Sequence, residues 1–312
     1  MPINNKLNDI TNPVSGKFNK PVETCFYDHL GVIEVELLNA PSYKELETYI
    51  PQFVDATWND FPRDNYSLGE RCFLVDETLA GKTLPTALET IGLVFLISNI
   101  DLIDVTHLLR HRTMSFSAIC SADRDMRYDD CLVKPSIAED LSEVDSGTDW
   151  WKAGFYHRFT KIVTDAKQLY ADMVDSGEIS ILDARTILPR CLEHHYYARV
   201  NLKDAIHFIK QRIDRQIQPE SDNIIALKMW IEIVKKYPPI KKLIDLDATD
   251  AWYIETAPTG RNSNIYMPEK PRNDVFEYKE QWFMYKKQRS EMRGGQVFIQ
   301  LWNELRKELE DL

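Results

Sequence analysis

The longest apolar stretch of the chain is "IGLVFLISNI", residues 91–100. A membrane-spanning helix needs roughly 20 apolar residues, so this stretch is too short to cross a bilayer. A short apolar run rich in β-branched residues is typical of a strand that is buried in a folded domain. We therefore predict a buried strand at 91–100 and a protein that has no membrane partner.

The segments around this strand alternate between strand and helix patterns. Residues 31–40, "GVIEVELLNA", alternate as a strand does. Residues 42–58 indicate a helix interrupted near Pro51, and 101–112 indicate a helix with one apolar face. Further helices are expected at 151–175, 180–190, 202–213 (capped by Asn201), 222–237 (capped by Ser221) and 295–312. This order favours an α/β fold of the α+β type over regular βαβ alternation.

Charge and cysteine usage limit the class of partner. The 312 residues carry a net charge of −11 and have a pI near 5.2, which argues against direct nucleic-acid binding. The five cysteines include no CxxC pair, so we expect free thiols in a reducing cytosol and no metal site. The polar N-terminus contains no export signal. We expect a cytoplasmic protein, in the host cytoplasm if the gene is viral.

Cationic residues gather at the end of the 101–112 segment. Arg110, His111 and Arg112 are consecutive within "LLRHRTMSFSAICSADRDMRY", residues 108–128. Arg185 and Arg212 each border another apolar run. Because the guanidinium fork matches phosphate in a bidentate way, these segments could meet in one pocket for anionic ligands. The alternative is that each arginine is an ordinary solvated helix residue.

Four ordered motifs resemble those of the flavin-dependent thymidylate synthases. "RHRTMS" (110–115) followed by "RY" (127–128) resembles their arginine–histidine–arginine signature. The other three are "TALET" (86–90), "ARTILP" (184–189) and "ARVNLKDAIHFIKQRIDRQIQ" (198–218). The resemblance covers about 25–243. It leaves residues 1–24 as a flexible lead and 244–312 as a C-terminal extension of unknown role.

The resemblance implies a mixed or antiparallel sheet flanked by helices, on a homotetramer with active sites between subunits. It implies synthesis of dTMP from dUMP, with FAD as cofactor and with NADPH and methylenetetrahydrofolate as co-substrates. Arg212 would be the catalytic residue beside the pyrimidine ring. The nucleotide would also be held by His107, Ser121, Arg127 and Arg185, and the flavin would be lined by Arg110, His111, Arg112, Thr113, Asn201, Lys203, His207 and Gln216.

The chain departs from the family pattern near the expected base. Ser117-Ala118 stands where the family has an Asn-Glu pair, so Asp123 or Asp125 would have to replace the glutamate. Arg124 competes with Arg127 for the phosphate. Thr90, His107, Lys203, His207 and Gln216 also occupy positions where the family usually has other residues.

These departures leave other functions open. The product could be 5-hydroxymethyl-dUMP, if water captures the methylene group, or the base could be the cytosine of dCMP. The chain could also be a non-catalytic nucleotide-binding homologue, or a flavin oxidoreductase that only oxidises NADPH. Our prediction from the sequence is the transfer of a one-carbon unit to C5 of a pyrimidine deoxynucleotide.

Overall fold

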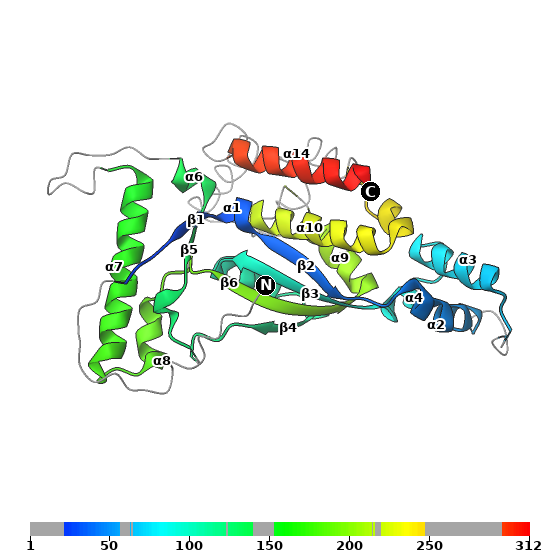
Figure 1. Cartoon of the computed structure of the whole chain (residues 1–312), viewed down its shortest axis with the longest axis horizontal. Helices are drawn as coiled ribbons and strands as arrows, with labels where there is room; N and C mark the ends of the chain where they lie inside the picture. The colour runs from blue at the N-terminus through cyan, green and yellow to red at the C-terminus, as the bar shows by residue number, and fades with distance from the viewer. Residues whose placement is uncertain are drawn as a thin grey trace, which may run out of the picture.

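The computed structural model describes residues 22–56, 63, 65–122, 124–139, 153–213, 215, 220–246 and 295–312. A four-stranded sheet lies at its centre, with the order β2-β3-β6-β4 (Figure 1). All three pairings are antiparallel. The strands are β2 (Glu34–Asn39), β3 (Gly92–Ile100), β6 (His194–Asn201) and β4 (Ser115–Ala118). The buried strand expected at 91–100 is therefore confirmed as β3, and it lies between two neighbours.

Helices cover this sheet. In Figure 1, α10 (Glu220–Lys236) runs along the sheet and α14 (Gly295–Asp311) lies over α10, while α9 (Leu202–Arg212) joins β6 to this layer. Asn201 caps α9 as expected, because its side chain accepts a hydrogen bond from the backbone amide of Asp204 at 2.8 Å. Phe298 and Trp302 of α14 join the same hydrophobic core as the sheet. The expected mixed sheet flanked by helices is confirmed.

Two helices, α2 (Tyr43–Asp55) and α3 (Leu68–Leu79), pack against each other at the end of the molecule opposite α7. The predicted interruption at Pro51 is wrong, because α2 runs through it. The carbonyl of Glu47, which Pro51 cannot bond, accepts instead from the Arg71 guanidinium at 3.5 Å. The helix α3 is not among those expected from the sequence, although Ser67 and Glu70 form a capping box at its start. The short α4 (Thr86–Glu89) follows.

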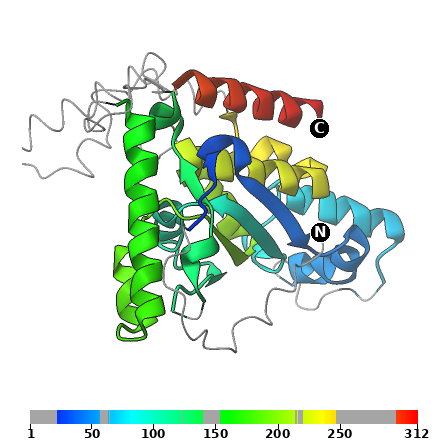
Figure 2. The ribbon, with the colours of Figure 1, turned by 60° about the vertical axis from the view of Figure 1, so that its left-hand side comes forward.

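A second, smaller core lies at the other end of the chain. The long helix α7 (Phe155–Ser176) stands upright in Figure 2, next to α8 (Ile181–Ala184) and the 3-10 turn η3 (Arg185–Ile187). Two short parallel strands, β1 (Phe26–Asp28) and β5 (Cys131–Val133), run beside them. The buried side chains of this core are those of Met126, Cys131, Val163, Tyr170, Ala184 and Leu192.

A buried polar network joins α5 (Leu102–Leu108) to its neighbours. Asp104 accepts hydrogen bonds from His29 at 2.6 Å and from Ser221 at 2.5 Å. Lys134 Nζ lies 2.6 Å from His29 Nδ1 and 2.9 Å from Asp101. The lysine ammonium thus holds the position that a cation could take among His29, Asp101 and Asp104. The expectation that Ser221 caps a helix is wrong, because α10 begins at Glu220 and Ser221 binds Asp104 instead.

The remaining short elements are α1 (His29–Val32), the 3-10 turn η1 (Met126–Tyr128), α6 (Pro135–Ala138) and the 3-10 turn η4 (Pro238–Leu243). Within the described ranges, every helix is too short or too polar to cross a membrane.

Candidate active site

The consecutive cationic residues lie in the turn that leads from α5 to the edge strand β4. The predicted helix 101–112 ends earlier than expected, at Leu108, because the chain turns there: the amide of His111 donates to the carbonyl of Leu108 at 3.1 Å. Arg110, Arg112 and Thr113 are exposed on this turn. The His111 ring packs edge-to-face with the Phe208 ring of α9, and the two ring centroids are 4.5 Å apart.

Arg212, the last residue of α9, is the centre of the polar contacts behind this turn. Its side chain is 10% exposed. Its Nε donates to His111 Nε2 at 2.8 Å, and its Nη2 donates to the carbonyl of His107 at 2.8 Å. Its Nη1 donates to Asp222 Oδ2 at 2.7 Å. The structure therefore brings together three residues that the sequence placed in the site, 101 and 105 positions apart along the chain.

His111 is held in its neutral form. Burial, together with the charges of Arg212 and His207, lowers the pKa of His111 from 6.5 to about 4. An arginine Nε–H can only donate, so His111 Nε2 must accept and the ring proton must lie on Nδ1. Near neutral pH the turn therefore presents two exposed guanidinium groups and one uncharged imidazole.

This lowered pKa predicts a loss of stability in mild acid. An unfolded histidine binds its proton below pH 6.5, whereas folded His111 does so only near pH 4. The unfolded state thus binds more protons between these values, so the free energy of unfolding falls as the pH falls from 6.5 to 4. Urea unfolding of His111→Gln should show a shallower fall across this range. The burial-lowered pKa values of His194 and His195 will keep part of the slope in the variant. Identical slopes for the two proteins would contradict this assignment.

The nucleotide residues expected near 121–127 and at 185 lie with the second core. Arg127 donates to Asp125 at 2.6 Å and forms a bidentate pair with Asp175 of α7. Arg185 donates to the carbonyl of Leu182 at 3.2 Å. Arg124 pairs with Asp129. Ser121 lies in the turn before them and is half-buried. Arg127 and Arg185 therefore contact α7 and α8, whereas Arg212 contacts α5, the turn after it and α10, so the cationic candidates of one chain form two groups.

The remaining flavin candidates lie around α9. The Asn201 amide caps the helix and also donates to the Asp204 side chain at 2.7 Å. Lys203 pairs with Glu89 of the "TALET" segment, which joins two of the four motifs in space. His207 is exposed and bonds Gln211 at 2.9 Å. Gln216, and Asp123 as a replacement for the missing glutamate, lie outside the described residues.

Two residues of the cluster, Asp222 and Asn223 in the first turn of α10, are not among the site residues expected from the sequence. Both are fully buried. Asp222 is the carboxylate partner of Arg212, and Asn223 Nδ2 donates to the backbone carbonyl of Arg212 at 2.7 Å. A polar "SDN" run ahead of an apolar helix indicates a helix start. The signal for a buried role is that the helix is apolar on nearly every face, so the polar residues of its first turn are buried with it.

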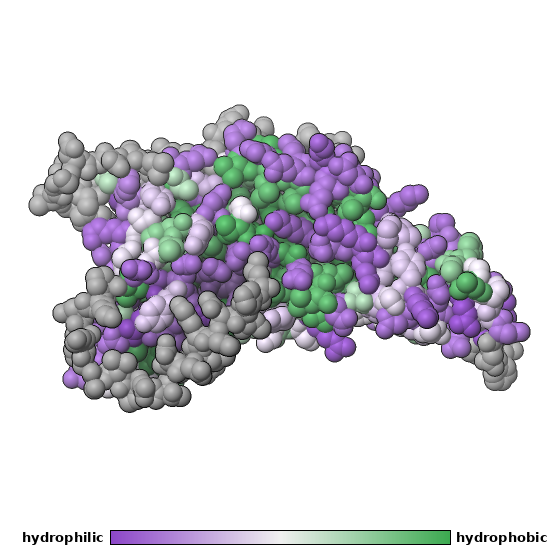
Figure 3. Space-filling view, in the orientation of Figure 1, coloured by the Kyte–Doolittle hydropathy of each residue, from purple (hydrophilic) through white to green (hydrophobic). Residues whose placement is uncertain are grey.

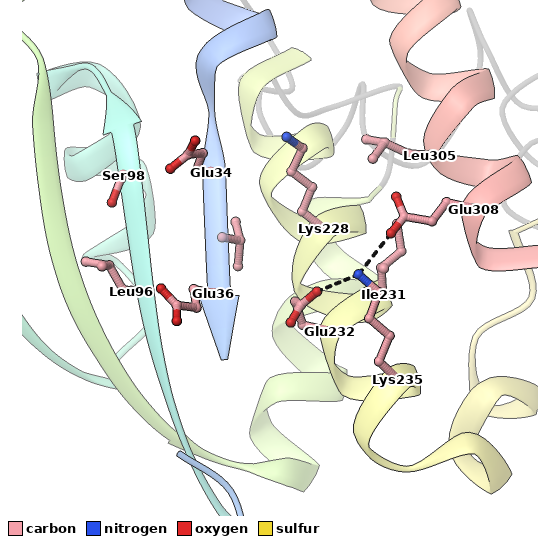
Figure 4. A pocket seen from close by; sticks show the side chains of 11 residues that line it. Glu34, Glu36, Leu96, Ser98, Lys228, Ile231, Glu232, Lys235, Leu305 and Glu308 are labelled. Carbon is pink, nitrogen blue, oxygen red and sulfur yellow. Dashed lines mark hydrogen bonds and ion pairs between the residues drawn. The ribbon is translucent and has the colours of Figure 1, made fainter. Parts of the chain in front are cut away.

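A cavity of about 310 Å³ lies elsewhere, between β2, β3, α10 and α14 (Figure 4). Over this part of the surface, hydrophobic residues alternate with hydrophilic ones (Figure 3). The cavity is lined by Glu34, Glu36 and Lys228, and by Lys235, which bonds both Glu232 and Glu308. None of the expected site residues lines it, so we place the candidate active site at the His111–Arg212 cluster.

Comparison with known proteins agrees with the motifs. The family described as "Thymidylate synthase complementing protein" matches residues 54–239. A flavin-dependent thymidylate synthase from Thermococcus onnurineus is 26% identical over 205 residues, which are 65% of this chain and 79% of that protein.

Solved structures show the same fold. The UMP/dUMP methylase PolB from Streptomyces cacaoi, bound with 5-Br dUMP, is 22% identical and superposes with a TM-score of 0.51 over 73% of this chain and 97% of PolB. PolB bound with 5-Br UMP gives 19% identity and a TM-score of 0.50 over the same shares. The chain belongs to the thymidylate synthase complementing protein family, the family of the flavin-dependent thymidylate synthases, and is an enzyme of the methyltransferase type.

Proposed function

We propose that this enzyme transfers a one-carbon unit to C5 of dUMP, with FAD as cofactor and with methylenetetrahydrofolate and NADPH as co-substrates. The observation that carries the proposal is the cluster of buried Arg212 with the half-buried His111 and His107, next to the exposed Arg110 and Arg112. The two PolB structures hold brominated UMP and dUMP, which supports a pyrimidine monophosphate as the substrate class.

The residues of the α5–β4 turn suit a flavin dinucleotide. The pyrophosphate of FAD is anionic, and Arg110 and Arg112 offer two exposed guanidinium forks with the Thr113 hydroxyl beside them. Bound FAD would supply the hydride that completes the new methyl group. Asn201 and Lys203 already hold Asp204 and Glu89, so they would have to exchange these partners to contact a cofactor.

Arg212 has a place in the chemistry because C5 of uracil is a poor nucleophile. A fixed cation near the ring carbonyls stabilises the enolate-like charge that develops when C5 attacks a one-carbon unit. Arg212 is buried and its guanidinium is held in a fixed position by Asp222, so it is preorganised for this role. His107 Nδ1 is buried, makes no hydrogen bond to any described residue and lies 3.5 Å from the Asp222 carboxylate.

A second copy of the chain would complete the site. Arg127 and Arg185 lie with α7 and α8, apart from the contacts of Arg212. The helix α7 exposes 58% of Phe155, 55% of Ile162 and 44% of Leu169, an apolar face suited to another subunit. We propose a homotetramer in which the Arg127–Arg185 group of one subunit faces the His111–Arg212 cluster of another.

One experiment tests the function. Purified protein should be yellow, should be bleached by NADPH, and should have four times the 36.4 kDa chain mass by light scattering. It is then incubated with methylenetetrahydrofolate, NADPH and, in parallel, dUMP, UMP or dCMP, and the mass of the nucleotide product is measured. We expect dUMP to gain one CH₂ group. A gain of CH₂O would indicate hydroxymethylation. A colourless protein that cannot be loaded with FAD, or NADPH oxidation that is independent of nucleotide, would contradict the proposal.

A further inference from the structure

Asp222 lies where two helices of the site meet. It sits in the first turn of α10 and its side chain is fully buried. Its Oδ2 accepts from Arg212 Nη1 at 2.7 Å and lies 3.5 Å from His107 Nδ1. The neighbouring Asn223 donates to the Arg212 carbonyl at 2.7 Å. The start of α10 therefore holds both the side chain and the backbone of the last residue of α9.

The carboxylate fixes the direction of the guanidinium. A buried arginine with no counter-charge tends to turn toward water, whereas an ion pair in a low-dielectric site holds it in place. The plane of the Arg212 guanidinium is set by Asp222 on Nη1 and by the His107 carbonyl on Nη2. Once that plane is fixed, Nε–H points at His111 Nε2, 2.8 Å away.

We infer that Asp222 is a positioning residue that fixes Arg212 and, through it, holds His111 as the tautomer with its proton on Nδ1. Among the described residues, His107, His207 and the Tyr196 hydroxyl also face this unit, and the pKa of Tyr196 is raised by burial and by the charge of Asp222. The importance of this positioning for the reaction rests on the proposed function. The assignment of the His111 tautomer does not depend on it.

The test is a comparison of Asp222→Ala and Asp222→Asn with the wild-type protein. The protein is labelled with ¹⁵N-histidine and its seven histidines are observed by solid-state NMR, with the His111 signals assigned by their loss in His111→Gln. We expect the wild type to show a protonated Nδ1 and an unprotonated Nε2. Asp222→Ala should give a mixture of the two tautomers and bind dUMP about ten-fold more weakly. Asp222→Asn keeps an oxygen acceptor, so it should shift both readouts in the same direction by less.

Asp104→Asn is the matched control, because Asp104 is an equally buried carboxylate that contacts the same turn of α10 through Ser221. This variant should be less stable than the wild type but keep the His111 tautomer. If Asp222→Asn, or folded Asp222→Ala, retains the wild-type tautomer, the inference is overturned. It is also overturned if Asp104→Asn mixes the tautomers to the same degree. A wild-type protein that binds neither FAD nor dUMP would refute the proposed function instead, and the NMR comparison would still decide the inference.

Discussion

A chain that ends after Gly294, and so lacks α14, is expected not to fold stably. Four side chains of this helix lie in the main core: Phe298, Trp302, Leu305 and Leu309, none more than 7% exposed. Truncating one large core side chain costs about 2–5 kcal/mol, so losing four costs on the order of 10 kcal/mol. A whole domain is stable by only about 5–15 kcal/mol. The measurement is urea unfolding followed by circular dichroism.

Point variants in α14 show whether the truncated chain loses stability because core packing is lost or because the chain is shorter. Leu309→Ala removes a core contact, and Lys307→Ala changes an exposed residue of the same helix. Leu309→Ala should cost about 2–4 kcal/mol, and Lys307→Ala less than about 0.5 kcal/mol. Cooperative unfolding of the shortened chain at the wild-type urea midpoint would show that the core closes without α14.

Trp302 links this helix to the chain around Arg212. The Arg215 guanidinium lies over the Trp302 ring, 5.3 Å from its centroid, and Arg215 follows Arg212 by three residues. α14 also closes one side of the cavity in Figure 4, where Glu308 bonds Lys235 of α10 at 2.9 Å. The helix at the end of the C-terminal extension therefore packs on the same α10 whose first turn holds Arg212.

Local patterns predicted the individual elements well. The alternation at 31–40 and the apolar run at 91–100 are β2 and β3, and the amphipathic stretch near 151–175 is α7. These features succeed because each depends on neighbouring residues alone. The errors at Pro51 and Ser221 have the opposite origin. In each case a partner distant in the chain, Arg71 or Asp104, takes the hydrogen bond that local rules assign elsewhere.

The site could be predicted only where motifs carried it. The resemblance brought His107, His111 and Arg212 together, and the structure joins them by direct contacts. Asp222 could not be predicted as a site residue, because an acidic residue in the first turn of a helix is common for reasons of the helix dipole alone. Only the fold shows that this carboxylate faces inward. Likewise, the separation of Arg127 from Arg212 follows from α7 packing on its own core, which sequence spacing does not encode.

The first turn of α10 therefore joins two buried polar groups. Ser221 points to Asp104, at the start of α5, and Asp222 points to Arg212 and His107, behind the end of α5. The helix α5, which leads into the cationic turn, is thus fixed near both ends by two adjacent residues of α10. Since polar contacts in a dry core demand defined geometry, this arrangement sets the position of α5 more sharply than apolar packing would.

Asp104→Ala is expected to be strongly destabilising. It leaves the buried His29 without its carboxylate partner and removes the acceptor of Ser221, whereas Lys134 keeps its closer partner Asp101 at 2.9 Å. Although burial opposes ionisation, the hydrogen bond from His29 and the charge of Lys134 lower the pKa of Asp104, so the carboxylate is charged at neutral pH. Removing one member of a buried ion pair costs about 3–5 kcal/mol, which urea unfolding at pH 7 would measure.

A double variant shows whether this cost comes from the buried imidazole that loses its acceptor. His29→Leu in the Asp104→Ala background removes that imidazole and should recover part of the lost stability. Ser221→Ala alone should cost only about 1 kcal/mol, because it removes one neutral donor. If Asp104→Ala and Ser221→Ala were equally mild, the network would be a set of independent hydrogen bonds. The position of α5, and of the cationic turn that follows it, would then be set by apolar packing instead.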